Sequence, residues 1–517
     1  MDVRGLRIGL NGQSAERFCA PEADDLGRAT RLDLQRLWHQ APPMNVIDAV
    51  VVGSGPNGLA AAVALARAGH SVHLIEGAET IGGGLRTVAN TLPGFAHDEC
   101  SAIHPTGVLS PFLRELPLAE HGLEWVRFAH SFGHPLDGGR AIVSERSLDA
   151  MVHRLGVDGR AYRSLVKPFV DAGPDLFKDL LAPFARIPHR PVLFARFGLK
   201  GLLPASWLSR RFETDEGRAL VAGCAAHSIL PLDFWGTGAM AMVFLISMHL
   251  EDWPCARGGS AAIGDALASL LKASGGTIET GRWVRSLADL PPHRVALFDT
   301  TPRALSAIVG DALPGGFRRR LANFRYGPGV FKVDYALDGP IPWRAPELAG
   351  ASTIHVGGTL AEIAASERAM WDGVPHDRPF LIVCQQSSND RTRAPDGKQT
   401  GYAYCHVPSG YTVDMTAAIT RQIERYAPGF QDRILAQHST SPAAFEAMNP
   451  NLIGGAITGG AATLWQLIAR PTLRLNPYST PNPSLFLCSG STPPGGGVHG
   501  MSGYWAAQAA MKALKKR

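Results

Sequence analysis

The clearest hydrophobic pattern in the sequence is a short apolar run followed by glycines and then by an alanine-rich segment. Residues 49–52 are Ala-Val-Val-Val, a run typical of a strand that is buried on both faces. Residues 59–68, rich in alanine and leucine, predict a helix that ends at Gly69. The mostly apolar segment Val72–Ile75 predicts the next strand. A strand, a helix and a strand in this order predict a βαβ unit with parallel strands.

Two distant parts of the chain have patterns that complete such a domain. Within residues 257–299, apolar side chains at helical spacing (positions 263, 267, 270 and 271) predict a helix closed by Gly275-Gly276. Thr277–Glu279 and Trp283-Val284 are predicted strands after it. Near the end, Leu485–Cys488 predicts a strand, followed by a glycine-rich loop and an alanine-rich helix. One nucleotide-binding domain built from separated segments is therefore the simplest prediction.

The intervening stretches have mixed patterns, helical around residues 148–180 and 218–250 and strand-like at 331–337 and 402–407. We predict an α/β protein in which a mixed α+β substrate domain with a helical part interrupts a discontinuous Rossmann-like domain. Residues 1–43 are expected to be a disordered extension, with Met44 as the true start of the protein as the alternative. The predicted boundaries are 44–105, 255–300 and 471–517 for the Rossmann-like domain, and 106–254 and 301–470 for the substrate domain.

The loop after the first strand has the glycine spacing of a dinucleotide fingerprint. It comprises Gly53, Ser54, Gly55 and Gly58. The first glycine permits the tight turn, the second lets a diphosphate approach the backbone, and the third lets helix and strand pack closely. The helix N-terminus presents N–H groups and positive dipole to the diphosphate. Glu76, at the end of the second strand, is placed to accept the ribose hydroxyls, and its charge disfavours a 2′-phosphate as in NADP.

Two further glycine clusters favour FAD over NAD. The first contains Gly83 and Arg86, an arginine placed to lie beside the diphosphate. The second is the loop 493–500, Pro-Pro-Gly-Gly-Gly-Val-His-Gly, which precedes the last helix. A helix N-terminus aimed at the N1–C2=O edge of a flavin would stabilise the negative charge of the reduced ring. An extended FAD needs several chain segments around it, and these clusters supply them.

Composition narrows the class of protein. The chain has 517 residues, 45% of them hydrophobic, and its net charge of +5 reflects 50 basic and 45 acidic residues spread along the sequence. This balance argues against a nucleic-acid partner. The seven cysteines form no C-x-x-C pair, which argues against a zinc site, and we predict no metal. An odd cysteine count also argues against a disulfide framework and favours a reducing compartment.

We expect a cytoplasmic protein because residues 1–43 carry acids throughout and have no apolar core typical of a signal peptide. A membrane-spanning helix is not expected, since outside the nucleotide motif no run of eighteen uncharged apolar residues occurs. The apolar stretch Ala239–Met248 favours a buried helix. A substrate tunnel, or a peripheral membrane contact at that stretch, is the open alternative.

The first and last motifs resemble the phytoene desaturase-like branch of the flavin amine-oxidase superfamily. The matching stretches are VVVGSGPNGLAAAVALARAGHSVHLIE, GGGLRT, DECSAIHP, VDYALDGPIPW and STPPGGGVHGMSGYWAA. The resemblance implies an FAD-binding Rossmann-like domain. It implies FAD contacts at Gly53, Gly55, Gly58, Glu76, Gly83, Arg86, Val284 and Gly490, with the backbone of Val498–Met501 at the flavin ring.

Two positions depart from the pattern of that family. Where relatives have Asp or Asn after a glycine pair and a histidine three residues later, this chain has Ala456 and Gly459. A polar substrate contact is thereby in doubt. In the last flavin strand, where many members have Asp, this chain has Ser489 and Gly490. The carboxylate that contacts the ribitol of FAD in many members is therefore missing from this position, whereas FAD binding itself is still expected.

Candidate catalytic residues are few. His499 is the histidine nearest the inferred flavin ring, and it is predicted either to relay a proton or only to cap its loop. We predict that His104 is a buried, hydrogen-bonded histidine of the core rather than a catalytic group. Tyr504, on the last helix, is likewise predicted to be a core residue. Hydride transfer to a flavin chiefly needs a dry pocket and correct placement, so the absence of an acid–base motif from the sequence is compatible with it.

We therefore predict an FAD-dependent oxidoreductase of the dehydrogenase or desaturase type. Its substrate is expected to be a hydrophobic small molecule that gives a hydride to flavin N5, with oxygen or a quinone as the final acceptor. Three alternatives stay open: a flavin amine oxidase, an FAD-bound isomerase or cyclase, and a non-catalytic binding protein on the same fold. An amine oxidase would need a lysine near the flavin and an aromatic cage, neither of which is evident in the sequence.

Overall fold

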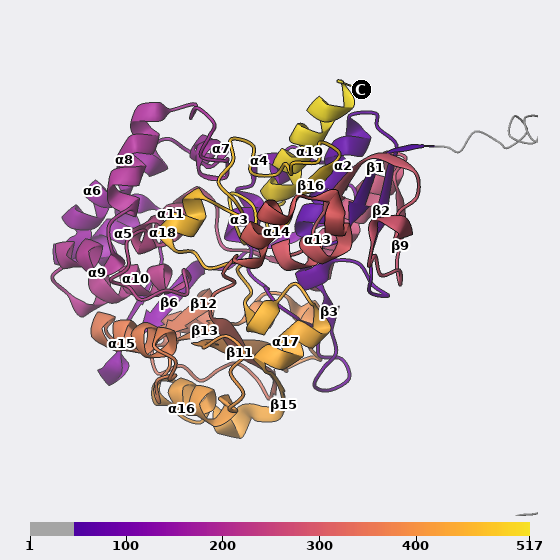
Figure 1. Ribbon diagram of the computed structural model, residues 1–517. Helices are drawn as coiled ribbons and strands as arrows, with labels where there is room; N and C mark the ends of the chain where they lie inside the picture. Colours follow the sequence, from indigo (N-terminus) through magenta and orange to yellow (C-terminus); the bar gives the residue numbers. More distant parts are fainter. Residues whose placement is uncertain (1–45, 517) are drawn as a thin grey trace, which may run out of the picture. The chain divides into compact units, whose positions relative to one another are not determined.

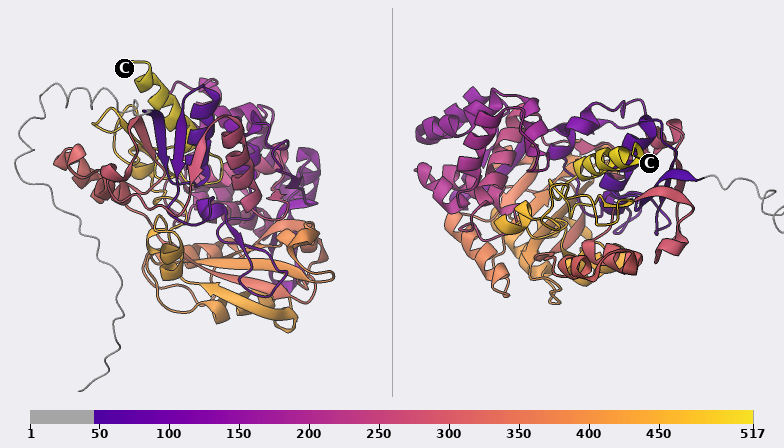
Figure 2. Two further views of the ribbon diagram at one scale, coloured as in Figure 1. Left: turned by 90° about the vertical axis from the view of Figure 1, so that its right-hand side faces the viewer. Right: turned by 45° about the horizontal axis from the view of Figure 1, so that its top comes forward.

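The computed structural model describes residues 46–516. The extension predicted at residues 1–43 lies outside the described residues. Within residues 46–516, the strands form two large sheets and two short two-stranded sheets (Figure 1). The two large sheets lie apart in Figure 2, the first in indigo and pink and the second in orange.

The first sheet is the predicted parallel one. Its strands run in the order β16-β10-β1-β2-β9, and each neighbouring pair is parallel. In the described chain it consists of β1 (Ile47–Val52), β2 (Val72–Ile75), β9 (Thr277–Glu279), β10 (His293–Phe298) and β16 (Leu485–Leu487). The central position of β1 explains its continuous apolar run, because both faces of a central parallel strand are buried.

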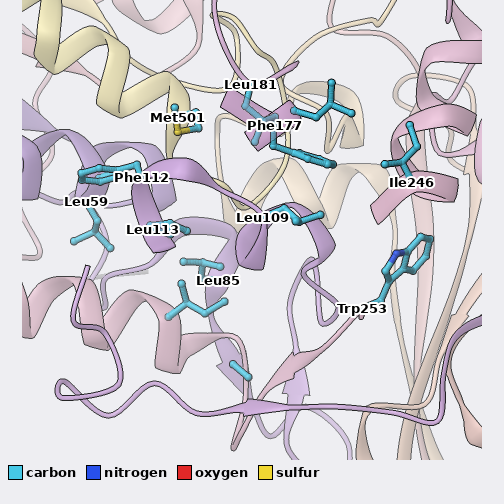
Figure 3. Packing of buried hydrophobic residues seen from close by; sticks show 14 of the residues in the cluster. Leu59, Leu85, Leu109, Phe112, Leu113, Phe177, Leu181, Ile246, Trp253 and Met501 are labelled. Atoms are coloured by element: carbon cyan, nitrogen blue, oxygen red, sulfur yellow. The ribbon is translucent and has the colours of Figure 1, made fainter. Parts of the chain in front are cut away.

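Alternate residues of β1 enter two different apolar clusters. Val51 packs toward α2 (Pro56–Arg67), α12 (Ala261–Ala273) and α19 (Met501–Leu514). In Figure 3, Leu59, Phe112 and Met501 belong to this cluster. Val50 packs on the opposite side with side chains of α13 (Pro302–Val309) and α14 (Gly315–Ala322). Residues 302–321 thus cover a face of the first sheet, although the predicted boundary at residue 300 assigned them to the substrate domain.

The second sheet has the order β15-β11-β14-β13-β12-β6-β7. Its pairs are antiparallel except β6 with β12, which is parallel. In the described chain its strands are β6 (His130–Pro135), β7 (Ala141–Val143), β11 (Gly329–Leu337), β12 (Ala351–Val356), β13 (Leu381–Cys384), β14 (Gln399–Val407) and β15 (Ile434–Thr440). One face is apolar and is covered by α16 (Thr416–Tyr426).

The opposite face of the second sheet adjoins the helical part, where α10 contacts β6 and β12. The helices of this part are α5 (Leu148–Arg154), α6 (Gly159–Val170), α7 (Phe177–Leu180), α8 (Pro191–Gly201), α9 (Ala205–Leu208), α10 (Asp215–Ala226) and α11 (Thr237–Leu250). The predicted buried helix over residues 239–248 is confirmed, since Ala241, Met242, Leu245 and Ile246 of α11 have no exposed surface. Among residues 46–516, no helix is long and apolar enough to cross a membrane.

Most predicted elements of the first sheet are confirmed, with two differences. The strand predicted at Trp283-Val284 is wrong: the chain turns at Gly281 (φ +72°), and Val284 joins an apolar cluster without pairing to a neighbouring strand. Strand β10 was not predicted, although it lies next to β1 in the sheet. Its apolar residues 295–298 form a run too short to distinguish a strand from a buried helical turn.

Candidate cofactor site

The loop between β1 and α2 has a conformation that requires glycine. Gly53 has φ +97°, in the left-handed region that side chains disfavour. A Cβ added to Gly58 would lie 2.0 Å from the Gly53 carbonyl oxygen, so only glycine permits this approach. The N-terminus of α2, which follows Gly55, is therefore held close to the end of β1. Such a helix N-terminus binds anions.

Glu76 lies where β2 ends and is 9% exposed. Its Oε2 accepts hydrogen bonds from the backbone N–H of Ser54 (2.8 Å) and from the Ser54 hydroxyl (2.6 Å). Its Oε1 accepts from the N–H of Ala78 at 2.9 Å. These bonds hold the carboxylate beside the glycine loop, at the position expected for a ribose contact.

Asp299 is a residue of this loop that the sequence did not reveal. It follows β10, and its Oδ2 accepts a hydrogen bond from the N–H of Gly58 at 2.8 Å. The same Oδ2 would be 2.6 Å from a Cβ on Gly55. The pKa of Asp299 is raised to about 7, chiefly by burial and to a smaller extent by the charge of Glu76, although the hydrogen bond from the Gly58 N–H lowers it. The N-terminus of α2 thus already holds an acidic group.

The second glycine cluster lies against the first. A Cβ on Gly83 would be 3.1 Å from the Cα of Gly55, so the two backbones nearly touch. Arg86 donates from Nε to the Thr80 hydroxyl at 3.0 Å and from Nη2 to the Thr80 carbonyl at 2.9 Å. The Nη2 atom is also 3.8 Å from Oε1 of Glu76. The guanidinium is thereby placed beside the carboxylate at the end of β2.

The C-terminal loop and α19 are joined to the same region. A Cβ on Gly503 of α19 would be 1.8 Å from the carbonyl oxygen of Asn57, so α19 and α2 pack with their backbones in contact. Gly497 has φ +123°, and its Cβ would lie 3.4 Å from the Thr106 hydroxyl. The carbonyl oxygen of Val498 faces Gly107, at 3.0 Å from a Cβ on that residue. Met501, the first residue of α19, is 2% exposed.

His499 has the contact expected of a capping residue. Its Nδ1 accepts the backbone N–H of Met501 at 3.0 Å, and its carbonyl accepts the Ser110 hydroxyl at 2.6 Å. Burial lowers the pKa of His499 to about 4, so the imidazole is neutral near pH 7. A role as proton relay would have to use Nε2.

Two further predicted contacts, Val284 and Gly490, lie close to the ends of strands of the first sheet. Val284 is 8% exposed and packs with Val52 and Ile75, close to the ends of β1 and β2. Gly490 follows β16, where a Cβ would be 3.6 Å from the Cα of Gly496. All the predicted cofactor residues therefore lie in segments that border the first sheet or contact α2.

A buried lysine lies on the face of the second sheet opposite α16. Lys332 of β11 is 2% exposed, and its Nζ donates to the Asp98 carbonyl at 2.9 Å and to Oδ1 of Asp334 at 2.5 Å. The ammonium is 4.7 Å from the centroid of the Tyr402 ring, a cation–π contact. Because side chains alternate along the strand of residues 331–337, Lys332 lies on the other face of the sheet from Phe331 and Val333. This pattern was the signal available for finding it.

A second buried charge cluster, formed by Arg393, Asp98 and Asp390, lies near Lys332. Arg393 and Asp98 have no exposed surface, and Nη1 of Arg393 is 2.5 Å from Oδ2 of Asp98. Nε of Arg393 is 2.9 Å from Oδ2 of Asp390. The Arg393 charge and hydrogen bonds hold the pKa of Asp98 below its ordinary value despite burial.

Several histidines are buried and neutral rather than exposed for acid–base chemistry. His104 is 2% exposed, and its Nε2 is 2.9 Å from the Ser260 hydroxyl, as expected for a hydrogen-bonded core residue. His227 and His355 are 2.8 Å apart at their Nε2 atoms. Burial lowers the pKa of His104 to about 4 and that of His227 to about 3. Among residues 46–516, no group of three or more His, Cys, Asp or Glu side chains could hold a metal ion.

Comparisons with known proteins match the segment that carries the glycine loop and most of the chain around it. Residues 51–116 match the NAD(P)-binding Rossmann-like domain. The rat protein named pyridine nucleotide-disulfide oxidoreductase domain-containing protein 2 is 28% identical, over 90% of this chain and 94% of its own length. The mouse protein of the same name is 29% identical over the same shares. The chain is an oxidoreductase homologous to these proteins.

Solved structures show which fold this oxidoreductase has. An oxidoreductase from Methanosarcina mazei has a TM-score of 0.60 at 16% identity, covering 90% of this chain and 100% of its own. Putrescine oxidase bound to putrescine has a TM-score of 0.58 at 17% identity, covering 91% and 99%. Cyclohexylamine oxidase from Brevibacterium oxydans has a TM-score of 0.54 at 15% identity, again covering 91% and 99%. The domain match and this fold indicate a flavin or pyridine-nucleotide cofactor.

Proposed function

We propose that this oxidoreductase binds FAD and takes a hydride from a largely apolar substrate. The substrate would lose one hydride to flavin N5 and one proton, and oxygen or a quinone would then take the two electrons. The proposal comprises a dehydrogenase or desaturase reaction on a C–C or C–heteroatom bond. Bound FAD would supply the hydride-accepting chemistry, while the protein supplies binding, orientation and exclusion of water.

The observation that carries this proposal is the convergence of three glycine-rich segments on one helix N-terminus. The backbone of Gly83 lies against Gly55, and α19, which follows the C-terminal loop, packs with Gly503 on Asn57. A short dinucleotide motif alone would suit NAD equally well. Backbone that approaches closely from three parts of the chain suits an extended cofactor such as FAD.

The residues present fit this group. Glu76 is held beside the loop by Ser54 and would accept the ribose hydroxyls. The N-terminus of α2 donates the Gly58 N–H to the side chain of Asp299, so a backbone donor at this helix end points outward to an acceptor, as a diphosphate would require. Arg86 would balance charge near the diphosphate, and the backbone of Val498–Met501 at the start of α19 would face the flavin ring.

The absorbance spectrum of the purified protein tests the proposal. We expect yellow protein whose FAD is non-covalently bound and is released by heat or acid. Anaerobic bleaching of the flavin by members of a panel of apolar alcohols, ketones and polyenes would identify the substrate class. Colourless protein that takes up no FAD on titration would refute the cofactor assignment and favour a binding protein on this fold. Turnover without bleaching would favour an isomerase or cyclase.

A second candidate function is amine oxidation, favoured by the buried Lys332. Its ammonium lies over the Tyr402 ring, and the ring of Tyr404 is 6.2 Å from that of Tyr402. The two amine oxidases with this fold make amines natural additions to the panel. Bleaching by putrescine or cyclohexylamine, and not by the other compounds, would decide for this function.

Replacing Glu76 by alanine is expected to weaken FAD binding about ten- to hundredfold. The substitution removes charge-assisted hydrogen bonds of about 1.5–3 kcal/mol. Titration of the protein stripped of FAD, followed by flavin fluorescence, measures the change. Glu79→Ala is the matched control because Glu79 is exposed and three residues away. Equal affinities of a folded Glu76→Ala protein and wild type would show that the carboxylate only positions Ser54.

A further inference from the structure

An uncommonly basic segment lies in the helical part. Residues 181–212 contain six arginines and lysines and no aspartate or glutamate. The basic residues are Arg186, Arg190, Arg196, Lys200, Arg210 and Arg211. In the described chain, no carboxylate lies within ion-pair distance of any of these six side chains. The segment therefore carries a positive charge that its own fold does not neutralise.

The same segment presents apolar side chains to solvent. On α8, Val192 is 69% exposed and Leu199 is 73% exposed, and Leu202 directly after the helix is 44% exposed. Their spacing of seven and three residues places them on one side of the helix. Phe197 and Gly201 on the other side are buried. The outer side of α8 thus exposes large apolar side chains, which an ordinary surface helix buries.

The apolar surface continues on both sides of α8. Phe184 and Ile187, just before the helix, are 60% and 86% exposed. Trp207 of α9 is 47% exposed, and its ring centroid is 5.5 Å from that of Trp235, which is 51% exposed. Figure 1 shows α8 and α9 within the magenta helical part. Such a concentration exceeds isolated exposed apolar residues and indicates an interaction surface.

The positive charges are interspersed with these side chains. The pKa of Lys200 is lowered by burial and then by the charges of Arg211 and Arg196, so the three cations are electrostatically close. The Lys200 Nζ donates to the carbonyls of Ser164 and Leu165, both at 3.0 Å. The guanidinium of Arg210 lies over the Trp207 ring, 5.9 Å from its centroid. Arg196 sits four residues after Val192 and three before Leu199 on the apolar side.

We propose that this apolar–basic face, centred on α8 and Trp207, docks on an anionic lipid bilayer. Apolar side chains would enter the boundary between headgroups and acyl chains, and the arginines would contact anionic headgroups. Nucleic acid would match the charge but would leave the leucines and valine in water. An acidic protein partner would match the positive charge of the face. It would not explain why a tryptophan lies beside an arginine, an arrangement that suits the membrane interface. The site differs from residues 239–248, the stretch considered for membrane contact from the sequence.

Flotation of the purified full-length protein with lipid vesicles tests the proposal. We expect binding to vesicles of phosphatidylcholine with about one third phosphatidylglycerol, and weaker binding to pure phosphatidylcholine. Binding should weaken as salt rises from 50 to 500 mM, because salt screens headgroup attraction. The measurement needs neither substrate nor turnover, so it is independent of the proposed FAD chemistry.

Two double substitutions separate the apolar and basic contributions. Arg196→Gln with Arg211→Gln removes two charges, and at about fivefold for each charge we expect about twenty-fivefold weaker binding to anionic vesicles. Val192→Gln with Leu199→Gln is expected to weaken binding about ten- to hundredfold. Leu435→Gln is the matched control, since Leu435 is 46% exposed on β15, at the edge of the second sheet farthest from β7. Circular dichroism checks that each variant keeps its helices.

Three outcomes would overturn the proposal. The first is wild-type protein that does not float with anionic vesicles at 50 mM salt. The second is Leu435→Gln losing as much binding as the α8 variants. The third is a wild-type oligomer in light scattering that Val192→Gln with Leu199→Gln dissociates, without any change in flotation. That result would assign the face to contacts between copies of this chain.

Discussion

Asp299→Asn is expected to be more stable than wild type at pH 8 by about 4 kcal/mol and equally stable at pH 4. Burial raises the pKa of Asp299 from 3.8 to about 7 in the folded protein. Between these values the folded state holds a proton that the unfolded state has released, so wild-type stability falls as pH rises and levels off above about pH 7. Asparagine cannot ionise, and its carbonyl oxygen can still accept the Gly58 N–H. The largest difference should therefore appear above pH 7.

Urea unfolding of both proteins between pH 4 and pH 8 measures this difference. Comparing variant with wild type at each pH cancels the titrating groups that do not interact with Asp299. Two groups do interact with it and belong to the measured difference: Glu76, whose charge faces Asp299, and Cys488, whose pKa is raised by burial and by Asp299. The exposed Asp377, substituted by asparagine, is the control and should show no pH-dependent difference. A constant difference between Asp299→Asn and wild type across this range would mean that Asp299 ionises normally.

The same substitution should also change cofactor binding. A bound diphosphate would place negative charge near Asp299, so wild type should take up a proton on binding and lose affinity as pH rises through 7. The affinity of Asp299→Asn should depend less on pH. Flavin fluorescence titration at pH 6 and pH 8 checks this, and equal pH dependence in both proteins would place the diphosphate away from the Asp299 carboxyl.

Arg393→Met is expected to destabilise the fold by about 3–5 kcal/mol. Arg393 has no exposed surface, and its guanidinium contacts the carboxylates of Asp98 and Asp390. Methionine fills similar space but leaves Asp98 buried and unpaired, and an unpaired buried charge is costly. A lower urea midpoint with an unchanged dependence on urea concentration would show this loss.

Arg391→Met provides the control for this prediction. Arg391 is two residues away and exposed, so its substitution should change stability by less than about 0.5 kcal/mol. If the two variants had equal urea midpoints, Asp98 would become neutral or solvated in Arg393→Met without any loss of folding free energy. The double variant Arg393→Met with Asp98→Asn should recover part of the loss, because it removes the unpaired charge.

The βαβ unit between residues 47 and 76 could be predicted because its determinants are local. Gly53 and Gly58 lie in one loop, and the close approach between them depends only on residues in that loop. The alanine-rich helix at the end of the chain was equally evident. Its packing on α2, through Gly503 and Asn57, joins residues more than four hundred positions apart, and the helical pattern itself does not identify that partner.

Asp299 and Lys332 could not be assigned a role in the same way. The hydrogen bond between Gly58 and Asp299 spans 241 positions, and that between Lys332 and the Asp98 carbonyl spans 234. Alternation along residues 331–337 predicted the strand and placed Lys332 opposite Phe331. It did not show that the lysine's side of the sheet is also buried, because burial there depends on distant segments such as the one containing Asp98.

The sequence by itself determined the α/β class, the dinucleotide fingerprint and the glycine clusters, because short-range backbone preferences and glycine's lack of a Cβ act within a few residues. Only the tertiary structure decided that Asp299 lies at the N-terminus of α2 and that Lys332 and Arg393 are buried among carboxylates. It also placed Val192 and Leu199 on the solvent side of α8. Burial, pKa and exposure depend on neighbours brought together from distant positions, and no local pattern specifies those neighbours.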